Sequence, residues 1–261
     1  MIVDGRKMAS EVLARTKMRA EKLLRRPNLL VYVAPDETPA TRSYLKIKAR
    51  SAEEAGCDFE ETRSLTFSSR ADAVIVQLPL PSEVNTADVL NSIPLSQDAD
   101  VLSRASREKF ERGDADALLP PVVAAVRKIL EFGNVEVKGK KAVVIGSGFL
   151  VGAPVATWLT QWGAEVEVVT TTSGDLSAAL GNADIIVSGA GSPHLIKPEM
   201  LKEDVVLIDA GTSESGGTIA GDADPSCADK CAIFTPVPGG IGPIAVACLF
   251  DNAVTLAERE K

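Results

Sequence analysis

The chain has 261 residues, of which 45% are hydrophobic and 25% are charged. This length and composition are typical of globular proteins and suit one large domain or two modest ones. The formal net charge of -8 argues against nucleic acid or an anionic membrane as a partner, because phosphate groups would repel the chain at long range. We therefore expect a small-molecule partner.

The cysteines and the N-terminal residues indicate a cytoplasmic protein. Cys57, Cys227, Cys231 and Cys248 are scattered through a chain too long to need disulfides, so reduced thiols are expected. The only histidine, His194, is distant in sequence from these cysteines, and no metal site is predicted. No apolar segment of signal-peptide length begins the chain, and no run of about eighteen apolar residues follows.

The first half of the chain alternates strand and helix patterns. Apolar residues recur at helical spacing in the first of these segments, and the last is a nearly continuous apolar strand, which is typical of a parallel sheet covered on both faces. In chain order we expect a helix over 7–24, a strand over 28–33, a helix over 40–55 that ends at Gly56, and strands over 57–62 and 71–80.

The second half has the pattern of a small doubly wound nucleotide fold. A polar segment, 96–116, precedes a helix that is entered through two prolines, and we place the domain boundary there. The expected elements are helices over 118–132, 153–162 and 245–261, and strands over 141–145, 166–169, 184–187 and 205–208.

Glycines at 146, 148 and 152 lie between an expected strand and an expected helix. Such spacing lets the backbone turn tightly and aim N–H groups at a pyrophosphate. Glycines that simply end a strand and seat a helix would look similar, but the strand and helix context favours dinucleotide binding. The next strand ends in Val169-Thr170-Thr171-Thr172-Ser173, with neither an acid nor a base, so NAD and NADP both stay open.

Four separated segments together resemble the methylenetetrahydrofolate dehydrogenase/cyclohydrolase family over nearly the whole chain. The most specific is the last, a Pro-Gly-Gly-x-Gly-Pro turn that leads into the terminal helix. The segments are Tyr44-Leu45-Lys46-Ile47-Lys48, Val76-Gln77-Leu78-Pro79-Leu80-Pro81, Asp98-Ala99-Asp100, and the run from Thr235 to Pro243 (TPVPGGIGP).

The resemblance implies roles for particular residues. Tyr44 and Lys48 would face the reactive one-carbon bridge of the folate, and their spacing agrees, because residues four apart on a helix share a face. Gln77 would position the lysine, and Asp100 would hold the pterin ring. The further implied folate contacts are Leu78, Pro79, Pro238, Gly239, Gly240 and Ile241. The implied cofactor contacts are Gly146, Ser147, Gly148, Val151, Gly152, Thr170, Thr171, Thr172, Gly189 and Thr212.

The architecture implied by the resemblance is two α/β domains. A folate-binding catalytic domain would comprise 1–119 and 243–261, and a Rossmann-like doubly wound parallel sheet would comprise 120–242. The C-terminal helix would return to the first domain, and a homodimer would form through the nucleotide domain.

The implied reaction is oxidation of 5,10-methylenetetrahydrofolate with NADP or NAD, followed by hydrolysis of the methenyl product to 10-formyltetrahydrofolate. Tetrahydrofolate is then the carrier of the one-carbon unit. A lysine held near a cationic carbon would have its ammonium form disfavoured, which lowers its pKa toward a range useful for proton transfer. Our hypothesis is that Lys48 manages protons while Tyr44 and Gln77 orient it.

The chain departs from the family pattern mostly in the cofactor segments. The family's Gly-Arg-Ser is Gly146-Ser147-Gly148 here, and threonines replace an arginine-bearing segment after the next strand, which removes contacts to a 2′-phosphate. Val101 stands where the family has glycine, and Pro120-Pro121 replaces a Pro-Cys-Thr-Pro turn. Only about nine residues separate Glu61 from Ala71, so a helix found there in the family is missing.

Three other interpretations remain. The chain can be a cyclohydrolase that has lost hydride transfer, a non-catalytic folate-binding paralogue, or an unrelated Rossmann dehydrogenase that acts on a hydroxy or keto acid. The unrelated dehydrogenase would need its own general acid or base. The single histidine, His194, lies in an expected loop and fits a loop residue better than a catalytic one. Asp209, at the end of an expected strand, fits a ligand contact and a turn residue equally well.

Overall fold

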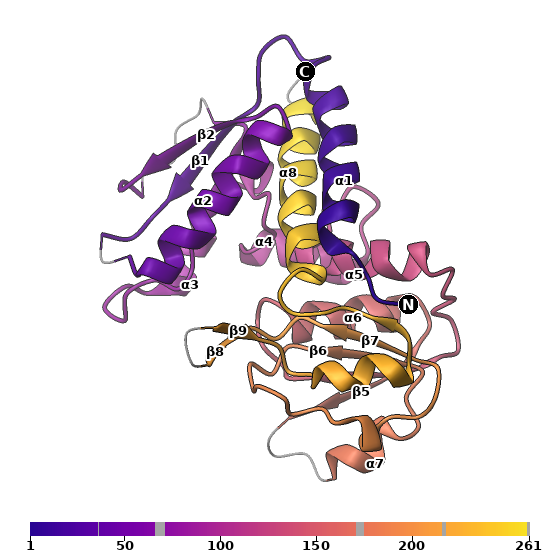
Figure 1. Ribbon diagram of the computed structural model, residues 1–261. Helices are drawn as coiled ribbons and strands as arrows, with labels where there is room; N and C mark the ends of the chain where they lie inside the picture. Colours follow the sequence, from indigo (N-terminus) through magenta and orange to yellow (C-terminus); the bar gives the residue numbers. More distant parts are fainter. Residues whose placement is uncertain (36, 66–70, 171–174, 216–217, 260–261) are drawn as a thin grey trace. The chain divides into compact units, whose positions relative to one another are not determined.

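The computed structural model describes residues 1–35, 37–65, 71–170, 175–215 and 218–259 (Figure 1). The chain divides into two compact units. The three-stranded unit comprises Ala9–Pro121 and Val246–Lys261, and the five-stranded unit comprises Met1–Met8 and Val122–Ala245. The predicted fold class, two α/β domains with a Rossmann-like second domain, is confirmed. Which unit binds folate and which binds a dinucleotide stays a prediction, as do the bounds assigned to those domains.

The three-stranded unit is built on a parallel sheet in the order β2-β1-β3. Its strands are β1 (Asn28–Tyr32), β2 (Asp58–Thr62) and β3 (Ala73–Val76). Its helices are α2 (Pro39–Glu54), α3 (Thr86–Asn91), the 3-10 turn η1 (Leu95–Gln97) and α4 (Arg104–Arg112), together with most of α1 (Gly5–Ala20) and of α8 (Ile241–Arg259).

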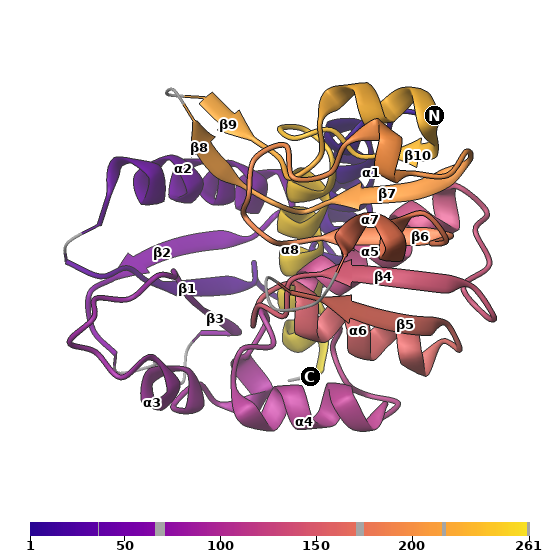
Figure 2. The ribbon, with the colours of Figure 1, turned by 90° about the horizontal axis from the view of Figure 1, so that it is seen from below.

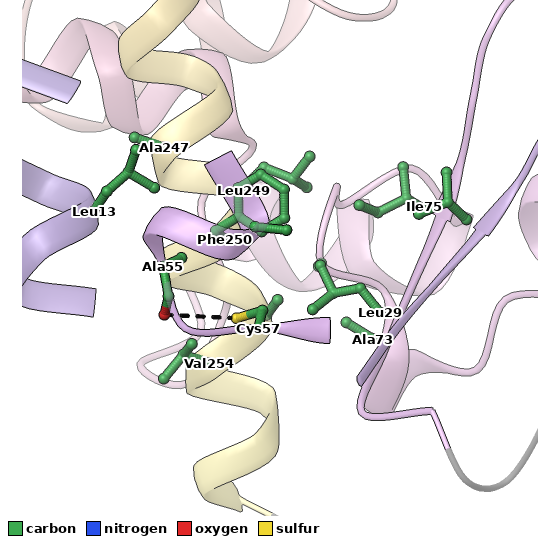
Figure 3. Packing of buried hydrophobic residues seen from close by; sticks show 14 of the residues in the cluster. Leu13, Leu29, Ala55, Cys57, Ala73, Ile75, Ala247, Leu249, Phe250 and Val254 are labelled. Atoms are coloured by element: carbon green, nitrogen blue, oxygen red, sulfur yellow. Dashed lines mark hydrogen bonds between the residues drawn. The ribbon is translucent and has the colours of Figure 1, made fainter. Parts of the chain in front are cut away.

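Helices cover both faces of β1 and β3, which explains why these strands are continuously apolar. On one face Leu29 and Ile75 pack with Leu13 of α1 and Phe250 of α8 (Figure 3). On the other face the apolar side chains of the strands pack against α3; this second cluster contains Tyr32, Val74, Val76, Val89, Leu90, Ile93 and Leu102.

The edge strand β2 is mostly polar, since Asp58, Glu60 and Glu61 are exposed and only Phe59 packs against the core. Residues 63–65 and 71–72, which are the described residues between β2 and β3, form no helix. The polar side chains of β2 suit an edge strand with one face in water.

Two expectations for the first half of the chain were wrong. The first helix ends at Ala20 rather than Leu24, and the Leu24 side chain is fully exposed. The strand expected over 71–80 is limited to β3, Ala73–Val76. The polar segment 96–116, for which no element was predicted, contains η1 and α4. In α4, Ser103 caps the N-terminus and Gly113, at φ +70°, ends the helix. Helices as short as α3 and α4 carry too few apolar repeats for periodicity to identify them.

The last helix, α8, returns to the three-stranded unit as predicted. Asn252 donates hydrogen bonds of 2.9 Å to the carbonyl oxygens of Ala99 and Leu119. Arg19 of α1 forms ion pairs with Asp251 and other acidic side chains of α8. Among the described helices, α8 alone is long and apolar enough to fit a membrane span by composition, but its apolar side chains lie in the core of this unit.

The five-stranded unit contains a parallel sheet in the order β10-β7-β6-β4-β5 (Figure 2). The strands are β4 (Lys141–Ile145), β5 (Glu165–Val169), β6 (Ile185–Ser188), β7 (Val205–Asp209) and β10 (Cys231–Phe234). The other elements are α5 (Pro121–Phe132), α6 (Gly152–Gln161), α7 (Leu176–Leu180), the 3-10 turns η2 (Pro198–Met200) and η3 (Pro225–Lys230), and a hairpin of β8 (Ser213–Ser215) and β9 (Thr218–Ala220).

The expected strands and helices of this unit are present, with ends within four residues of the predicted ones, but α7, β8, β9 and β10 were not predicted. The N-terminal residues lie beside β10, where Val3 N–H donates to the carbonyl oxygen of Phe234 at 2.8 Å. That contact is remote in sequence and no local pattern encodes it. The four cysteines are buried free thiols.

Candidate functional site

The amide of Gln77 is held between a lysine and the backbone. Gln77 directly follows β3, and its N–H donates to the carbonyl oxygen of Tyr32 at 2.9 Å, which extends the sheet by one residue. The side-chain Oε1 accepts a 2.9 Å hydrogen bond from Nζ of Lys48, and Nε2 donates to the carbonyl oxygen of Leu78 at 2.7 Å. Lys48 lies one turn after Tyr44 on α2, and the Tyr44 side chain is exposed.

Burial changes the acidity of Lys48 and Asp100 in opposite directions. Desolvation lowers the pKa of Lys48, and the nearby Asp100 carboxylate opposes that effect. Desolvation likewise raises the pKa of Asp100, while the charge of Lys48 opposes it and the charge of Asp98 adds to it. Both shifts favour neutral forms, since burial penalises an isolated charge. The lowered pKa agrees with the proton-transfer hypothesis for Lys48.

A tight turn positions Asp100, and Asp98 holds that turn. An isolated β-bridge joins Asp98 to β3, and its buried carboxylate accepts hydrogen bonds from the N–H groups of Leu102 (3.1 Å) and Ser103 (2.8 Å). Val101, which stands where the family has glycine, has φ +56°. A β-branched residue in this left-handed region is strained. The hydrogen bonds to Asp98 hold the turn in spite of that strain.

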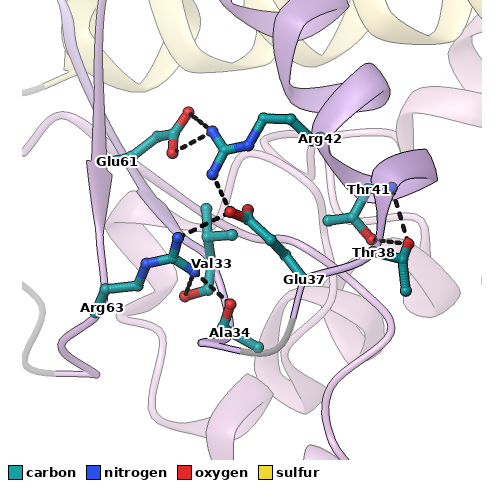
Figure 4. A network of polar contacts seen from close by, with 8 residues as sticks. All are labelled: Val33, Ala34, Glu37, Thr38, Thr41, Arg42, Glu61 and Arg63. Atoms are coloured by element: carbon teal, nitrogen blue, oxygen red, sulfur yellow. Dashed lines mark hydrogen bonds and ion pairs between the residues drawn. The ribbon is translucent and has the colours of Figure 1, made fainter.

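A network of four charged side chains fixes the start of α2 (Figure 4). Arg42, two residues before Tyr44, donates two 2.8 Å hydrogen bonds to the carboxylate of Glu61 at the end of β2, and it also contacts Glu37. Arg63 donates to Glu37 at 3.1 Å and to two successive carbonyl oxygens just after β1. These contacts join the ends of β1 and β2 to the helix that carries Tyr44 and Lys48.

In the five-stranded unit, glycines allow the loop after β4 to pack closely. Gly146 has φ +91°, and its N–H donates to the carbonyl oxygen of Val169 at the end of β5 (2.8 Å). A Cβ on Gly152 would lie 2.0 Å from the carbonyl oxygen of Gly146, and a Cβ on Gly189 would lie 2.7 Å from the side chain of Val151. No side chain fits at these two positions, which seat α6 and the loop after β6 against the glycine loop.

Gly148 differs from these glycines, because no atom lies within 4 Å of where its Cβ would be. Its neighbour Ser147 is exposed. The first residue of α6 follows Val151, which makes no side-chain cap to the helix N-terminus. Open space, an exposed glycine loop and a helix N-terminus are the features that a dinucleotide pyrophosphate needs. The residues present therefore fit a dinucleotide.

Asp222, which the sequence analysis did not single out, organises the loop after β6. Its buried carboxylate accepts hydrogen bonds from Ser188 Oγ (2.6 Å), Ala190 N–H (2.7 Å) and Ser192 N–H (2.7 Å). The surrounding sequence, Gly221-Asp222, gives only the weak indication that Gly-Asp pairs often form turns.

Asp209 at the end of β7 is a structural turn residue. Its carboxylate accepts hydrogen bonds from the backbone N–H groups of Gly211 (2.9 Å), Asp222 (3.2 Å) and Ala223 (2.8 Å). Burial raises the pKa of Asp209 to about 6, although the three N–H donors act against that shift. Of the two readings left open by the sequence, the geometry supports the turn.

The Pro-Gly-Gly loop packs on the first residues of the chain. Gly5 N–H donates to the carbonyl oxygen of Gly239 at 3.0 Å. A Cβ on Gly5 would lie 1.7 Å from the carbonyl oxygen of Gly240. Gly239 has φ +100° and open space around its Cα. Pro238 lies before this turn and Ile241 begins α8.

The structure thus groups the predicted residues into two sets. Lys48, Gln77 and Asp100 lie together in the three-stranded unit, with Leu78 and Pro79 directly after Gln77. The glycine loop, Val151, Gly189 and the end of β5 lie together in the five-stranded unit, where Thr170 follows β5 and Thr212 is exposed after β7. Thr171 and Thr172 lie outside the described residues, and His194 is an exposed loop residue.

Comparison with known proteins gives a consistent result. The sequence model of the tetrahydrofolate dehydrogenase/cyclohydrolase NAD(P)-binding domain matches residues 120–261. The bifunctional protein FolD of Hydrogenobaculum sp. is 33% identical over 270 residues, which cover 97% of each chain. Among the similar solved structures, two FolD enzymes each match this chain over its whole length.

The first of these structures is the FolD methylenetetrahydrofolate dehydrogenase/cyclohydrolase of Campylobacter jejuni, with a TM-score of 0.95, 30% identity and 99% of its own chain covered. The second is the Trypanosoma brucei FolD, complexed with NADP cofactor and inhibitor, with a TM-score of 0.92, 28% identity and 98% of its chain covered.

Proposed function

The chain belongs to the tetrahydrofolate dehydrogenase/cyclohydrolase family, and from this premise we propose that it oxidises 5,10-methylenetetrahydrofolate with NAD(P) and hydrolyses the product. The hydrolysis adds one water to the methenyl carbon, breaks the bond from that carbon to N5, leaves 10-formyltetrahydrofolate and releases one proton. Both activities serve one-carbon metabolism.

The observation that carries the hydrolytic half is the Lys48–Gln77 hydrogen bond beside Asp100. A neutral lysine amine has a lone pair that can accept a proton, and the desolvated site lowers the pKa of Lys48 and so favours that form. We propose Lys48 as the group that takes the proton from the attacking water. Gln77 orients the amine, and Tyr44, on the same face of α2, contacts the substrate next to it.

Asp100 is proposed to bind the pterin ring. A carboxylate accepts hydrogen bonds from N–H groups, so it gives the ring orientation more than it gives rate. The turn held by Asp98 fixes the backbone on both sides of it. Leu78, Pro79 and the loop from Pro238 to Ile241 are proposed as further folate contacts.

The dinucleotide is proposed to lie on the glycine loop of the five-stranded unit. Gly146, Gly148 and Gly152 would let the backbone approach the pyrophosphate, with Ser147, Val151, Thr170, Thr171, Thr172, Gly189 and Thr212 as the other contacts. When bound, the nicotinamide supplies the chemistry of hydride acceptance. The loops held by Asp222 and Asp209 would set the shape of that surface.

We further propose a cytoplasmic homodimer that assembles through the five-stranded unit. The strand β5 is an edge of the sheet, and its Val168 side chain is 40% exposed. An edge strand presents unpaired backbone N–H and C=O groups, which a second copy can pair. Sedimentation of the purified protein tests this: a monomer at micromolar concentration would contradict the dimer.

The test of the function is an absorbance assay with purified protein and 5,10-methylenetetrahydrofolate, run with NAD and with NADP, in which methenyl hydrolysis is followed in the same samples. Hydride transfer and hydrolysis together are expected. Hydrolysis alone would support the second candidate, a cyclohydrolase without dehydrogenase activity, which the altered cofactor segments favour. Loss of both activities, with folate still bound, would favour a folate-binding paralogue.

A further inference from the structure

The carboxyl edge of the five-stranded sheet has no basic residue in the loops that leave it. In a parallel sheet every strand ends at the same edge, and ligands bind outside that edge. Neither lysine nor arginine occurs in the five segments that follow the strands, which are 146–151, 170–175, 189–195, 210–212 and 235–240.

Three lysines of this unit lie instead at the opposite, amino edge. Lys141 is the first residue of β4. Lys202 pairs with Asp184, which directly precedes β6. Lys230, directly before β10, pairs with Glu203 at 2.6 Å, two residues before β7. Ion pairs and strand positions therefore hold these cations at the edge that a dinucleotide does not touch.

The end of β5 is where the adenosine ribose of a dinucleotide lies in such folds, because β5 follows the glycine loop and its helix in sequence. The hydrogen bond from Gly146 N–H to Val169 places this strand end directly beside the loop. Thr170 comes next, and Asp175 at the far end of the same segment caps α7 by accepting from Ser177 N–H at 2.9 Å. Within 170–175 the charged residue is therefore an acid.

Lys197, two residues beyond the loop that leaves β6, pairs with Asp224 at 3.2 Å, and two further cations lie at the other end of the sheet. Arg6 and Lys7 follow Gly5, which is bonded to Gly239 after β10. In the strand order β10 and β5 are the two outer strands, four spacings apart, or roughly 19 Å at the usual separation of neighbouring strands. At that separation solvent and salt screen most of the attraction to an exposed phosphate.

We infer that this chain selects NAD over NADP, an inference that rests on the proposed function. The 2′-phosphate of NADP carries nearly two negative charges and is bound in proteins by charge-assisted hydrogen bonds from arginine or lysine. Neither arginine nor lysine occurs in 170–175, the segment that follows β5. The 2′-hydroxyl of NAD needs only neutral hydrogen-bond partners, which threonine hydroxyls supply.

The test is equilibrium binding of NAD and NADP to the full-length protein by calorimetry, without folate and without turnover. We expect NAD to bind at least about tenfold more tightly, a factor that equals roughly 1.4 kcal/mol. Ser147→Arg and Thr170→Arg, which each place a cation beside the strand end, should raise the ratio of NADP affinity to NAD affinity about tenfold above that of the matched uncharged variants. Ser147→Gln and Thr170→Gln are the uncharged controls.

Each outcome of the binding experiment supports or overturns the NAD preference. Equal or tighter binding of NADP by the unaltered protein would overturn the inference while leaving dinucleotide binding intact. An NAD preference that neither arginine variant weakens would overturn the electrostatic cause proposed for it. No binding of either dinucleotide would overturn both the inference and the dehydrogenase half of the proposed function, whereas methenyl hydrolysis would remain separately measurable.

Discussion

Nζ of Lys48 donates a hydrogen bond of 2.9 Å to Oε1 of Gln77, which is the residue directly after β3. The orientation of the amide follows from its other end, since Nε2 donates to the carbonyl oxygen of Leu78. Oε1 must therefore face the lysine. One N–H of a neutral amine is fixed by this contact, and the lone pair stays available for a proton.

Replacement of Lys48 by methionine should abolish methenyl hydrolysis. Methionine keeps an unbranched side chain of similar length but has no group that can accept a proton. Loss of a positioned acid or base typically lowers a rate by about 10²–10⁴-fold. The decay of methenyl absorbance, corrected for the buffer-catalysed reaction, gives the rate. Lys46→Met is the matched control, because Lys46 is exposed on the same helix; a Lys48→Met enzyme that hydrolyses at full rate would disprove the assignment.

Replacement of Asp100 by asparagine should move the pH profile of hydrolysis toward lower pH. The carboxylate of Asp100 raises the pKa of Lys48 against the desolvation that lowers it. Without that charge the pKa of Lys48 falls further, so the free amine persists in more acidic solution. The measurement is kcat/KM for hydrolysis across pH, normalised to its own plateau to separate the profile from weaker folate binding. An unmoved profile, or one moved to higher pH, would show that Lys48 is not the titrating base.

The glycine loop permits a paired test of folding and binding. Gly152→Ala should destabilise the protein, because the new Cβ would lie 2.0 Å from the carbonyl oxygen of Gly146; overpacking of this kind typically costs about 1–3 kcal/mol. Gly148→Ala should leave the melting temperature nearly unchanged, since its Cβ meets no atom within 4 Å. It should nevertheless weaken dinucleotide binding by occupying space beside the pyrophosphate.

Thermal unfolding and calorimetry read the two effects separately. If Gly148→Ala bound the dinucleotide as well as the unaltered protein does, the loop would not be the pyrophosphate site.

Replacement of Asp222 by asparagine should lower the free energy of unfolding by about 1–3 kcal/mol. One of the two carboxylate oxygens, which now accept hydrogen bonds from buried donors, would become an amide NH₂ that cannot accept them. Those donors are Ser188 Oγ and the N–H groups of Ala190 and Ser192. The loop after β6 should loosen, and dinucleotide affinity should fall with it. Chemical denaturation gives the stability, with the exposed Asp229→Asn as control. Equal losses in both variants would remove any special role of Asp222.

Local patterns in the sequence predicted the alternation of strands and helices, the β4 strand to the residue, the glycine loop and the shared helix face of Tyr44 and Lys48, because these features depend on periodicity and glycine spacing. The two-domain architecture and the return of the last helix were implied by the resemblance of four motifs to a known family. The short elements α3, α4, α7 and β10 were not predicted, because a few residues are too few to show a helical or strand periodicity. Domain bounds and site roles remain predictions.

The contacts between distant residues are visible only in the folded chain. The hydrogen bond between Lys48 and Gln77, the three bonds that Asp222 accepts from residues about thirty positions earlier, and the packing of Gly5 on the Pro-Gly-Gly loop join parts of the chain that no local pattern relates. The same holds for the cations that gather at the amino edge of the five-stranded sheet. Composition counts charges, whereas only the strand order fixes the edge at which each one lies.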